Sequence, residues 1–167
     1  ITSQGINAND AVYSYPEKLR PYFPGSQGYN IMKLSPNGKL LLDGRPEEVC
    51  GLSDFDNTTG IISNRRQLYL TTPTFTFSPN STKAYFMYPT DTTIAGIPIS
   101  HYRVFQLDLF DTTLVVKPIY TTNELWNAHN ISMQLAPDGK IYFHSTPYLS
   151  CIEEPNKKGD SCRVVMQ

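Results

Sequence analysis

One short pattern occurs three times in this chain and limits the folds that are open to it. The three copies lie at 32–42, 75–86 and 133–143. In each copy, alternating apolar and polar residues lead to a proline-containing turn, and a second run rich in apolar and aromatic residues follows. This order is typical of a β-hairpin. The sequence therefore predicts three equivalent hairpins within one repeated architecture.

The turns of the three copies contain the residue types that favour chain reversal. In the first copy Ser35 can accept hydrogen bonds, Pro36 fixes its own backbone angle, and Gly38 allows a left-handed conformation. The third copy has Ala136 where the first has a serine. The second copy has Ser81 in place of the glycine, so we expect its turn to be one residue longer.

A second pair of candidate strands follows each hairpin, with turns at 57–60, 110–113 and 155–159. Each repeat then contains four strands in two consecutive hairpins. Such units, recurring at roughly 40 to 60 residues, are typical of the blades of a β-propeller. A β-sandwich also consists of short strands with frequent turns, but the recurrence of one turn at the same place favours the propeller. The predicted fold is all-β, with about three four-stranded antiparallel blades.

The repeats divide the chain into predicted blades at 30–73, 74–130 and 131–167, the last of them incomplete. The second blade carries a long insert at 89–101, and residues 1–29 form a connector or the end of a preceding blade. Propellers typically close with 4 to 8 blades. We therefore expect these blades to belong to a larger ring, in which the rest of the propeller or another chain covers the open blade faces.

Charge and hydropathy exclude two classes of partner. The chain has 14 Lys+Arg and 15 Asp+Glu, a net charge of -1, and no basic stripe that would follow a phosphate backbone. No stretch approaches the ~18 apolar residues of a membrane span. Residues 1–10 lack the basic start and apolar run of a signal peptide. We predict no nucleic-acid partner and no membrane span, and we expect any export signal to have been removed or to lie outside this chain.

The ordered motifs resemble a known propeller family. They are Met-x-Leu-Ser-Pro-Asn-Gly-Lys at 32–39, Asp-Phe-Asp-Asn-Thr-Thr-Gly-Ile-Ile-Ser at 54–63, Phe-Ser-Pro-Asn at 77–80, Gln-Leu-Ala-Pro-Asp-Gly-Lys-Ile-Tyr at 134–142 and Pro-Asn-Lys-Lys-Gly-Asp-Ser-Cys at 155–162. Over about 30–165 this order resembles the propellers of Bacteroidota cell-surface and gliding-motility-associated proteins. The resemblance implies export by type IX secretion to the extracellular or outer-membrane surface, and a binding or scaffolding role without shared chemistry.

Candidate partner-binding residues lie in the connecting loops of one predicted rim, because loops on a rigid scaffold often carry function. They are Arg45, Glu47, His101, Trp126 and His129. Tryptophan is enriched at binding hot spots, although this one could equally pack between blades. We expect the three histidines of the chain to lie toward this rim, but no carboxylate accompanies them at a ligand spacing, so no metal site is predicted.

The cysteines allow one cross-link. Cys151 and Cys162 flank a short loop of the last predicted hairpin, so a disulfide could join them in an oxidising compartment. The alternative is two buried thiols. In either case Cys50 would remain free.

No hydrolase, phosphate-binding or dinucleotide-binding motif is present, and we predict no catalytic residue and no cofactor. Asp54 with Asp56, and Asp108 with Asp111, resemble the paired acids of a glycosidase. Both pairs lie beside turns, where aspartate is common. We therefore predict a non-enzymatic interaction or scaffolding module of an exported cell-surface protein that binds a protein or glycan. The alternatives are an accessory or catalytic propeller of a glycan-active enzyme, and one subunit of a multi-protein envelope assembly.

Overall fold

The computed structural model describes residues 31–44, 49–72, 74–94, 97–121, 131–145 and 148–165. These residues form three four-stranded antiparallel sheets, each built from strands that are consecutive in the chain. The predicted all-β fold with three four-stranded units is confirmed. No helix in the described ranges is long and apolar enough to cross a membrane. The predicted connector 1–29 lies outside them.

The first sheet contains β1 (Ile31–Leu34), β2 (Leu40–Gly44), β3 (Val49–Phe55) and β4 (Ile62–Thr71). The second contains β5 (Thr74–Phe77), β6 (Lys83–Ile94), β7 (Ile97–Asp108) and β8 (Val116–Thr121). The third contains β9 (Ile131–Leu135), β10 (Ile141–Ser145), β11 (Tyr148–Ile152) and β12 (Val164–Val165), and a short 3-10 helix, η2 (Gly159–Cys162), precedes β12.

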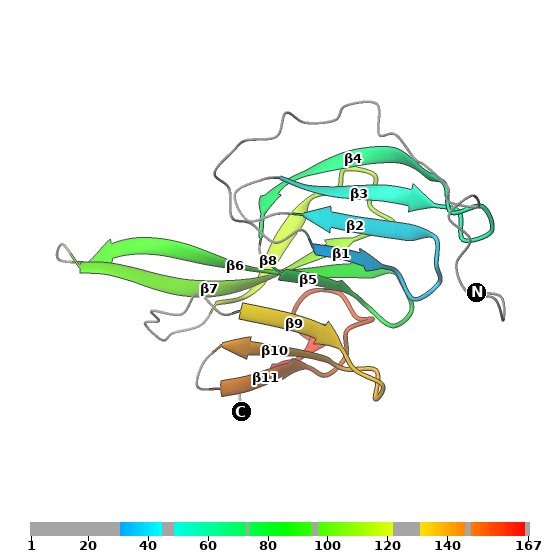
Figure 1. Ribbon diagram of the computed structural model, residues 1–167. Coiled ribbons are helices and arrows are strands. Elements are labelled where there is room, and N and C mark those ends of the chain that lie inside the picture. Colours follow the sequence, from blue (N-terminus) through cyan, green and yellow to red (C-terminus); the bar gives the residue numbers. More distant parts are fainter. Residues whose placement is uncertain are drawn as a thin grey trace, which may run out of the picture.

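The three sheets are stacked in chain order, with the second between the other two (Figure 1). Their first strands, β1, β5 and β9, lie next to one another. Face-to-face stacking of consecutive four-stranded sheets around a line of first strands is the arrangement of propeller blades. The chain is therefore a propeller-like β module.

Strand β6 supplies the centre of two separate cores because its side chains alternate between the two faces of the second sheet. Ala84 and Phe86 face the first sheet and pack in a cluster with residues such as Leu42 and Leu52. Tyr85 and Met87 face the third sheet. Their cluster includes Met133, Ile141, Phe143, Ile152 and Cys162 of the third sheet. The second sheet is thus buried on both faces.

The first two proline turns have the same length, so the expectation of a longer second turn is wrong. The N–H of Ser35 donates to Leu40 O at 2.9 Å, and the N–H of Ser78 donates to Lys83 O at the same distance. Ser81 has a φ of 59°, close to the 67° of Gly38, and so takes the left-handed position without a glycine.

The third turn is instead one residue shorter in its pairing register. Leu34 pairs with Leu41 in the first sheet, whereas the corresponding Leu135 pairs with Ile141. In the first turn, Ser35 Oγ accepts the N–H groups of both Lys39 and Leu40. Ala136 has no hydroxyl to hold this wider turn, and its own N–H donates to Lys140 O, one residue closer along the chain.

The predicted insert at 89–101 is a continuation of the second hairpin rather than a separate loop. β6 and β7 pair from Lys83↔Asp108 to Ile94↔Ile97. Pro89 and Pro98 both lie within this ladder, although proline disfavours interior strand positions. Threonine and isoleucine, which favour strands, are the commonest of the other residues in the segment. The extended hairpin projects well beyond the other strands of its sheet (Figure 1).

Turns of neighbouring sheets are also joined at the rim opposite this projection. The N–H of Asn37 donates to Ser81 Oγ at 3.0 Å, and the N–H of Asn80 donates to Asn156 Oδ1 at 3.2 Å. The proline turn of each of the first two sheets thus donates from the same position to the sheet that follows. These bonds fix the stacking as well as the individual hairpins.

Candidate functional site

The structure describes one of the five predicted partner-binding residues. His101 is half-buried at the base of the projecting hairpin, where it pairs with Thr90. Arg45, Glu47, Trp126 and His129 lie outside the described residues. The ends of β2, β6 and β10 point to the side from which the hairpin projects (Figure 1). Among the described residues, no group of three or more His, Cys, Asp or Glu side chains could hold a metal ion.

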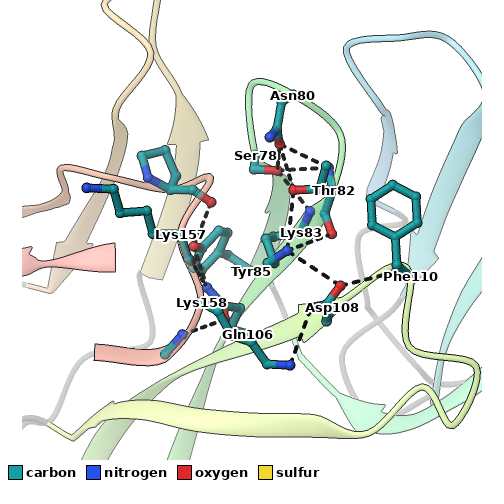
Figure 2. A network of polar contacts seen from close by, with 12 residues as sticks. Ser78, Asn80, Thr82, Lys83, Tyr85, Gln106, Asp108, Phe110, Lys157 and Lys158 are labelled. Carbon is teal, nitrogen blue, oxygen red and sulfur yellow. Dashed lines mark hydrogen bonds and ion pairs between the residues drawn. The ribbon is translucent and has the colours of Figure 1, made fainter. Parts of the chain in front are cut away.

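The most elaborate polar cluster lies between the second and third sheets (Figure 2). The buried Tyr85 O–H donates to Pro155 O at 2.8 Å, and Gln106 Nε2 donates to Tyr85 Oη at 2.7 Å. The same amide donates to Lys157 O at 2.8 Å and accepts from the N–H of Gly159 at 2.9 Å. One glutamine and one tyrosine therefore bind the loop that leads into η2, and they satisfy its backbone groups.

An acidic side chain beside this cluster forms ion pairs with two lysines (Figure 2). Asp108 lies 3.4 Å from Lys83 Nζ and 3.6 Å from Lys158 Nζ, and it accepts the N–H of Phe110 at 3.2 Å. Burial opposes ionisation of this carboxyl, but the Phe110 N–H and the Lys83 charge outweigh it and lower the pKa of Asp108. Lys158 comes from the third sheet's loop, so the ion pair links two sheets.

The acidity of the buried groups fits a structural role. Burial raises the pKa of Tyr85 well above its ordinary value. Burial also raises the pKa of the Cys162 thiol, which faces that tyrosine. A nucleophilic cysteine needs a lowered pKa, and a general acid or base needs a pKa near the working pH. These two groups therefore have the protonation behaviour of core residues.

Two hollows flank this junction. The first, about 160 Å³, lies between the β7–β8 region and the loop before η2, and Asp108, Asp111, Lys117 and Lys158 contribute charges of both signs to it. The second, about 310 Å³, lies between β8 and β12. Pockets that bury a drug-sized ligand measure roughly 300 to 1,000 Å³. The first hollow is too small for such a ligand, and the second is at the lower limit.

The carboxylates that resembled glycosidase acids are committed to local contacts. Asp54 pairs with Arg66 at 2.5 Å. Asp56 accepts hydrogen bonds from Thr59 and Thr58, which lower its pKa, and Asp111 accepts from Thr113 with the same effect. A glycosidase acid needs a raised pKa. The shifts at Asp56, Asp108 and Asp111 run in the opposite direction.

Cys151 and Cys162 are both free and buried in the structure, as in the second of the two alternatives for these cysteines. Ile152 packs in the same cluster as Cys162, on the face toward the second sheet. Successive strand residues point to opposite faces, so Cys151 points to the outer face of the third sheet. The two thiols therefore lie on opposite sides of one sheet. Cys50 is also free, in the core between the first and second sheets.

A repeated motif in the sequence marks the junction between the second and third sheets. Lys-Ala-Tyr-Phe at 83–86 recurs as Lys-Ile-Tyr-Phe at 140–143, and its lysine and tyrosine lie on one face of each strand. In the second sheet these residues are Lys83 and Tyr85, the centre of the polar cluster. The role of Gln106 had no comparable signal, because its partners are backbone atoms some fifty positions away.

Comparisons with known proteins show no family and a partial similarity to a solved structure. No protein-family model matches the chain, and no curated protein matches it. Among solved structures, the chain is similar to TolB from Acinetobacter baumannii, with 20% sequence identity and a TM-score of 0.44. The match covers 76% of this chain and 30% of that chain, so the present chain spans less than a third of the matched structure.

Proposed function

We propose that this propeller-like module is a non-enzymatic interaction module of an exported cell-surface protein, and that it binds a protein partner. The ordered motifs that resemble Bacteroidota surface propellers support export by type IX secretion and a location at the extracellular or outer-membrane surface. The commitment of Asp54, Asp56 and Asp111 to local contacts supports a role without catalysis. Binding is then the remaining role for a rigid scaffold with long connections.

The projecting hairpin is the observation that carries this proposal. β5 pairs with β6 only as far as Met87, and β8 pairs with β7 only from Arg103 onward. Between these limits and the tip, β6 and β7 have only each other as ladder partners among the described residues. We call residues 88–102 the ribbon. A two-stranded hairpin is marginally stable in water by itself, and its open edges can pair with another chain.

The composition of the ribbon favours a protein over a charged polymer as the partner. Residues 88–102 contain one carboxylate, Asp91, and neither lysine nor arginine. The other residues are mainly threonine, isoleucine and proline, and of the two tyrosines Tyr102 is buried in the core with the third sheet. Protein interface cores are depleted in charged residues. A polyanionic surface would instead require a basic patch.

The test is to shorten the ribbon and follow cross-linking in the native cells. Replacing residues 91–100 by Asn-Gly leaves Thr90 and His101 to flank a two-residue turn. We expect the native protein to cross-link to a defined protein and the shortened variant to lose that product. Phe110→Ser serves as the control, because Phe110 is 78% exposed on another connection. Equal cross-linking by all three proteins would show that the ribbon does not bind the partner.

A second assay separates binding from the glycan-active alternative. The purified protein is incubated with envelope polysaccharide, and released reducing ends are measured. We expect no release. Release that is abolished by Asp54→Asn or Asp108→Asn would contradict the non-enzymatic proposal.

A further inference from the structure

The second and third sheets present the same side-chain pattern on the face directed toward the next sheet. Lys83 Nζ lies 3.4 Å from the Asp108 carboxylate, and Lys140 Nζ lies 3.5 Å from Glu153. The two lysines begin equivalent segments, since Ala84 pairs with Leu107 as Ile141 pairs with Ile152. Tyr85 and Tyr142 occupy the same position two residues after the lysine. The two faces therefore present the same side of a contact that repeats from sheet to sheet.

Of these two faces, only that of the second sheet is covered by another sheet. Tyr85 is fully buried and donates to Pro155 O of the third sheet. Tyr142 is only half-buried and donates to Asp138, an exposed residue of its own hairpin, at 2.9 Å. Leu149 pairs with His144 on the same face and is 50% exposed. The outer face of the third sheet is therefore open at Tyr142 and Leu149, and it is of the kind that contacts the neighbouring sheet in the second sheet.

The first sheet has the complementary face, and this face is open along β1, although Leu41 and Ser53 on it are buried. Phe75 and Phe77 are directed toward the preceding sheet and are fully buried. The equivalent residues of the first sheet are Met32 and Leu34, in the same register within their hairpin. Met32 is 66% exposed and Leu34 is 51% exposed. Large apolar side chains at positions that are buried in the next repeat indicate a missing neighbour.

We propose that a second copy of this chain occupies these faces, with the first sheet of each copy packed on the third sheet of the other. A second copy presents both halves of the contact that the chain already makes twice internally. Two copies bring six four-stranded sheets, which lies within the usual range of about 4 to 8 blades for a closed propeller. Head-to-tail contacts that close on themselves form a ring. The net charge of -1 opposes such association very little.

This proposal is independent of the proposed function, because neither face includes the ribbon. Sedimentation equilibrium of the purified chain is the first measurement. We expect a mass of twice the 18.9 kDa of one chain. A mass of one chain at every concentration would overturn the proposal.

Two variants test the contact from its two sides. Leu34→Asp places a charge on the open face of the first sheet, and Leu149→Asp places one on that of the third. We expect each variant alone to sediment as a monomer. Val115→Asp is the matched control, because Val115 is 49% exposed on a connecting segment of the second sheet, and we expect it to remain dimeric.

A mixing experiment distinguishes this head-to-tail ring from a symmetric pairing of like faces. The third sheet of Leu34→Asp and the first sheet of Leu149→Asp are both unaltered, so a mixture of the two variants retains one of the two contacts. We expect the mixture to form a heterodimer that is weaker than the native dimer. A mixture that stays monomeric while the native chain is dimeric would overturn the head-to-tail arrangement. Circular dichroism of each variant shows whether its sheets have formed.

Discussion

Individual hydroxyls decide how these hairpins close. Ser78 is fully buried, and its Oγ accepts the N–H groups of Thr82 at 3.2 Å and Lys83 at 2.9 Å. Ser78→Ala leaves the buried N–H of Lys83 without this acceptor, which costs about 1 to 3 kcal/mol, whereas the N–H of Thr82 keeps Asn80 Oδ1 as its acceptor. We expect the free energy of unfolding in urea to fall by that amount. Ser132→Ala, at an exposed strand position, should change it by less than about 0.5 kcal/mol. Equal effects of the two substitutions would show that the hydroxyl does not hold the turn.

The charged junction predicts a pH dependence of stability. The folded pKa of Asp108 lies below the ordinary value of 3.8. A carboxyl with a depressed folded pKa stabilises the fold above its unfolded pKa, and this contribution is lost as the pH falls through the folded pKa. We therefore expect the free energy of unfolding to decrease as the pH drops below about 4, and to decrease less steeply in Asp108→Asn. Some slope should remain, because hydrogen bonds also lower the pKa of Asp56, Asp111 and Asp138. An unchanged slope in the variant would exclude Asp108 as a contributor.

Strands β6 and β7 each have a part that is flanked by β5 or β8 and a part, in the ribbon, that is not flanked. The effect of a flanking strand on local stability can therefore be compared within one strand. In the flanked part, residues such as Phe86 pair on both sides, with Phe75 and Phe105. In the unflanked part, the β-ladder runs between β6 and β7 alone among the described residues. Local opening is easier where few neighbours restrain the chain. We expect amide hydrogen exchange in 89–94 and 97–100 to be much faster than in 83–87. Equal protection along β6 would mean that another element covers the ribbon.

The ribbon also shows where prediction from the sequence stops at the scale of an element. The three hairpins were predictable because a turn motif and alternating residues are local signals. Pro89 and Pro98 obscured the ribbon, because proline normally ends a strand. Both prolines occupy the same class of cross-strand pair, in Pro89↔Tyr102 and Thr93↔Pro98. In an antiparallel ladder, every second residue directs its backbone nitrogen away from the partner. Proline is tolerated there because no ladder hydrogen bond is lost.

At the scale of the whole molecule, the second sheet joins two cores that do not share residues. Phe86→Ala removes a buried ring from the core with the first sheet, at a cost of about 3 to 5 kcal/mol. Met87→Ala removes a side chain from the core with the third sheet, at about 2 to 5 kcal/mol. We expect faster hydrogen exchange mainly in β2 and β3 for the first variant and mainly in β10 for the second. The same pattern of exchange in both variants would show that the three sheets open as one unit.

The sequence by itself determined the three hairpins, the positions of their turns and the grouping of strands into units of four, because these depend on residues within about a dozen positions of one another. Only the tertiary structure decided what each face meets. Lys83 and Tyr85 lie buried in a junction while Lys140 and Tyr142 lie on an outer face, although the two segments are nearly identical in sequence. Cys151 and Cys162 are close in sequence but are separated by the thickness of a sheet. In both cases the outcome depends on which sheet packs against which face, and contacts between distant segments leave no local pattern.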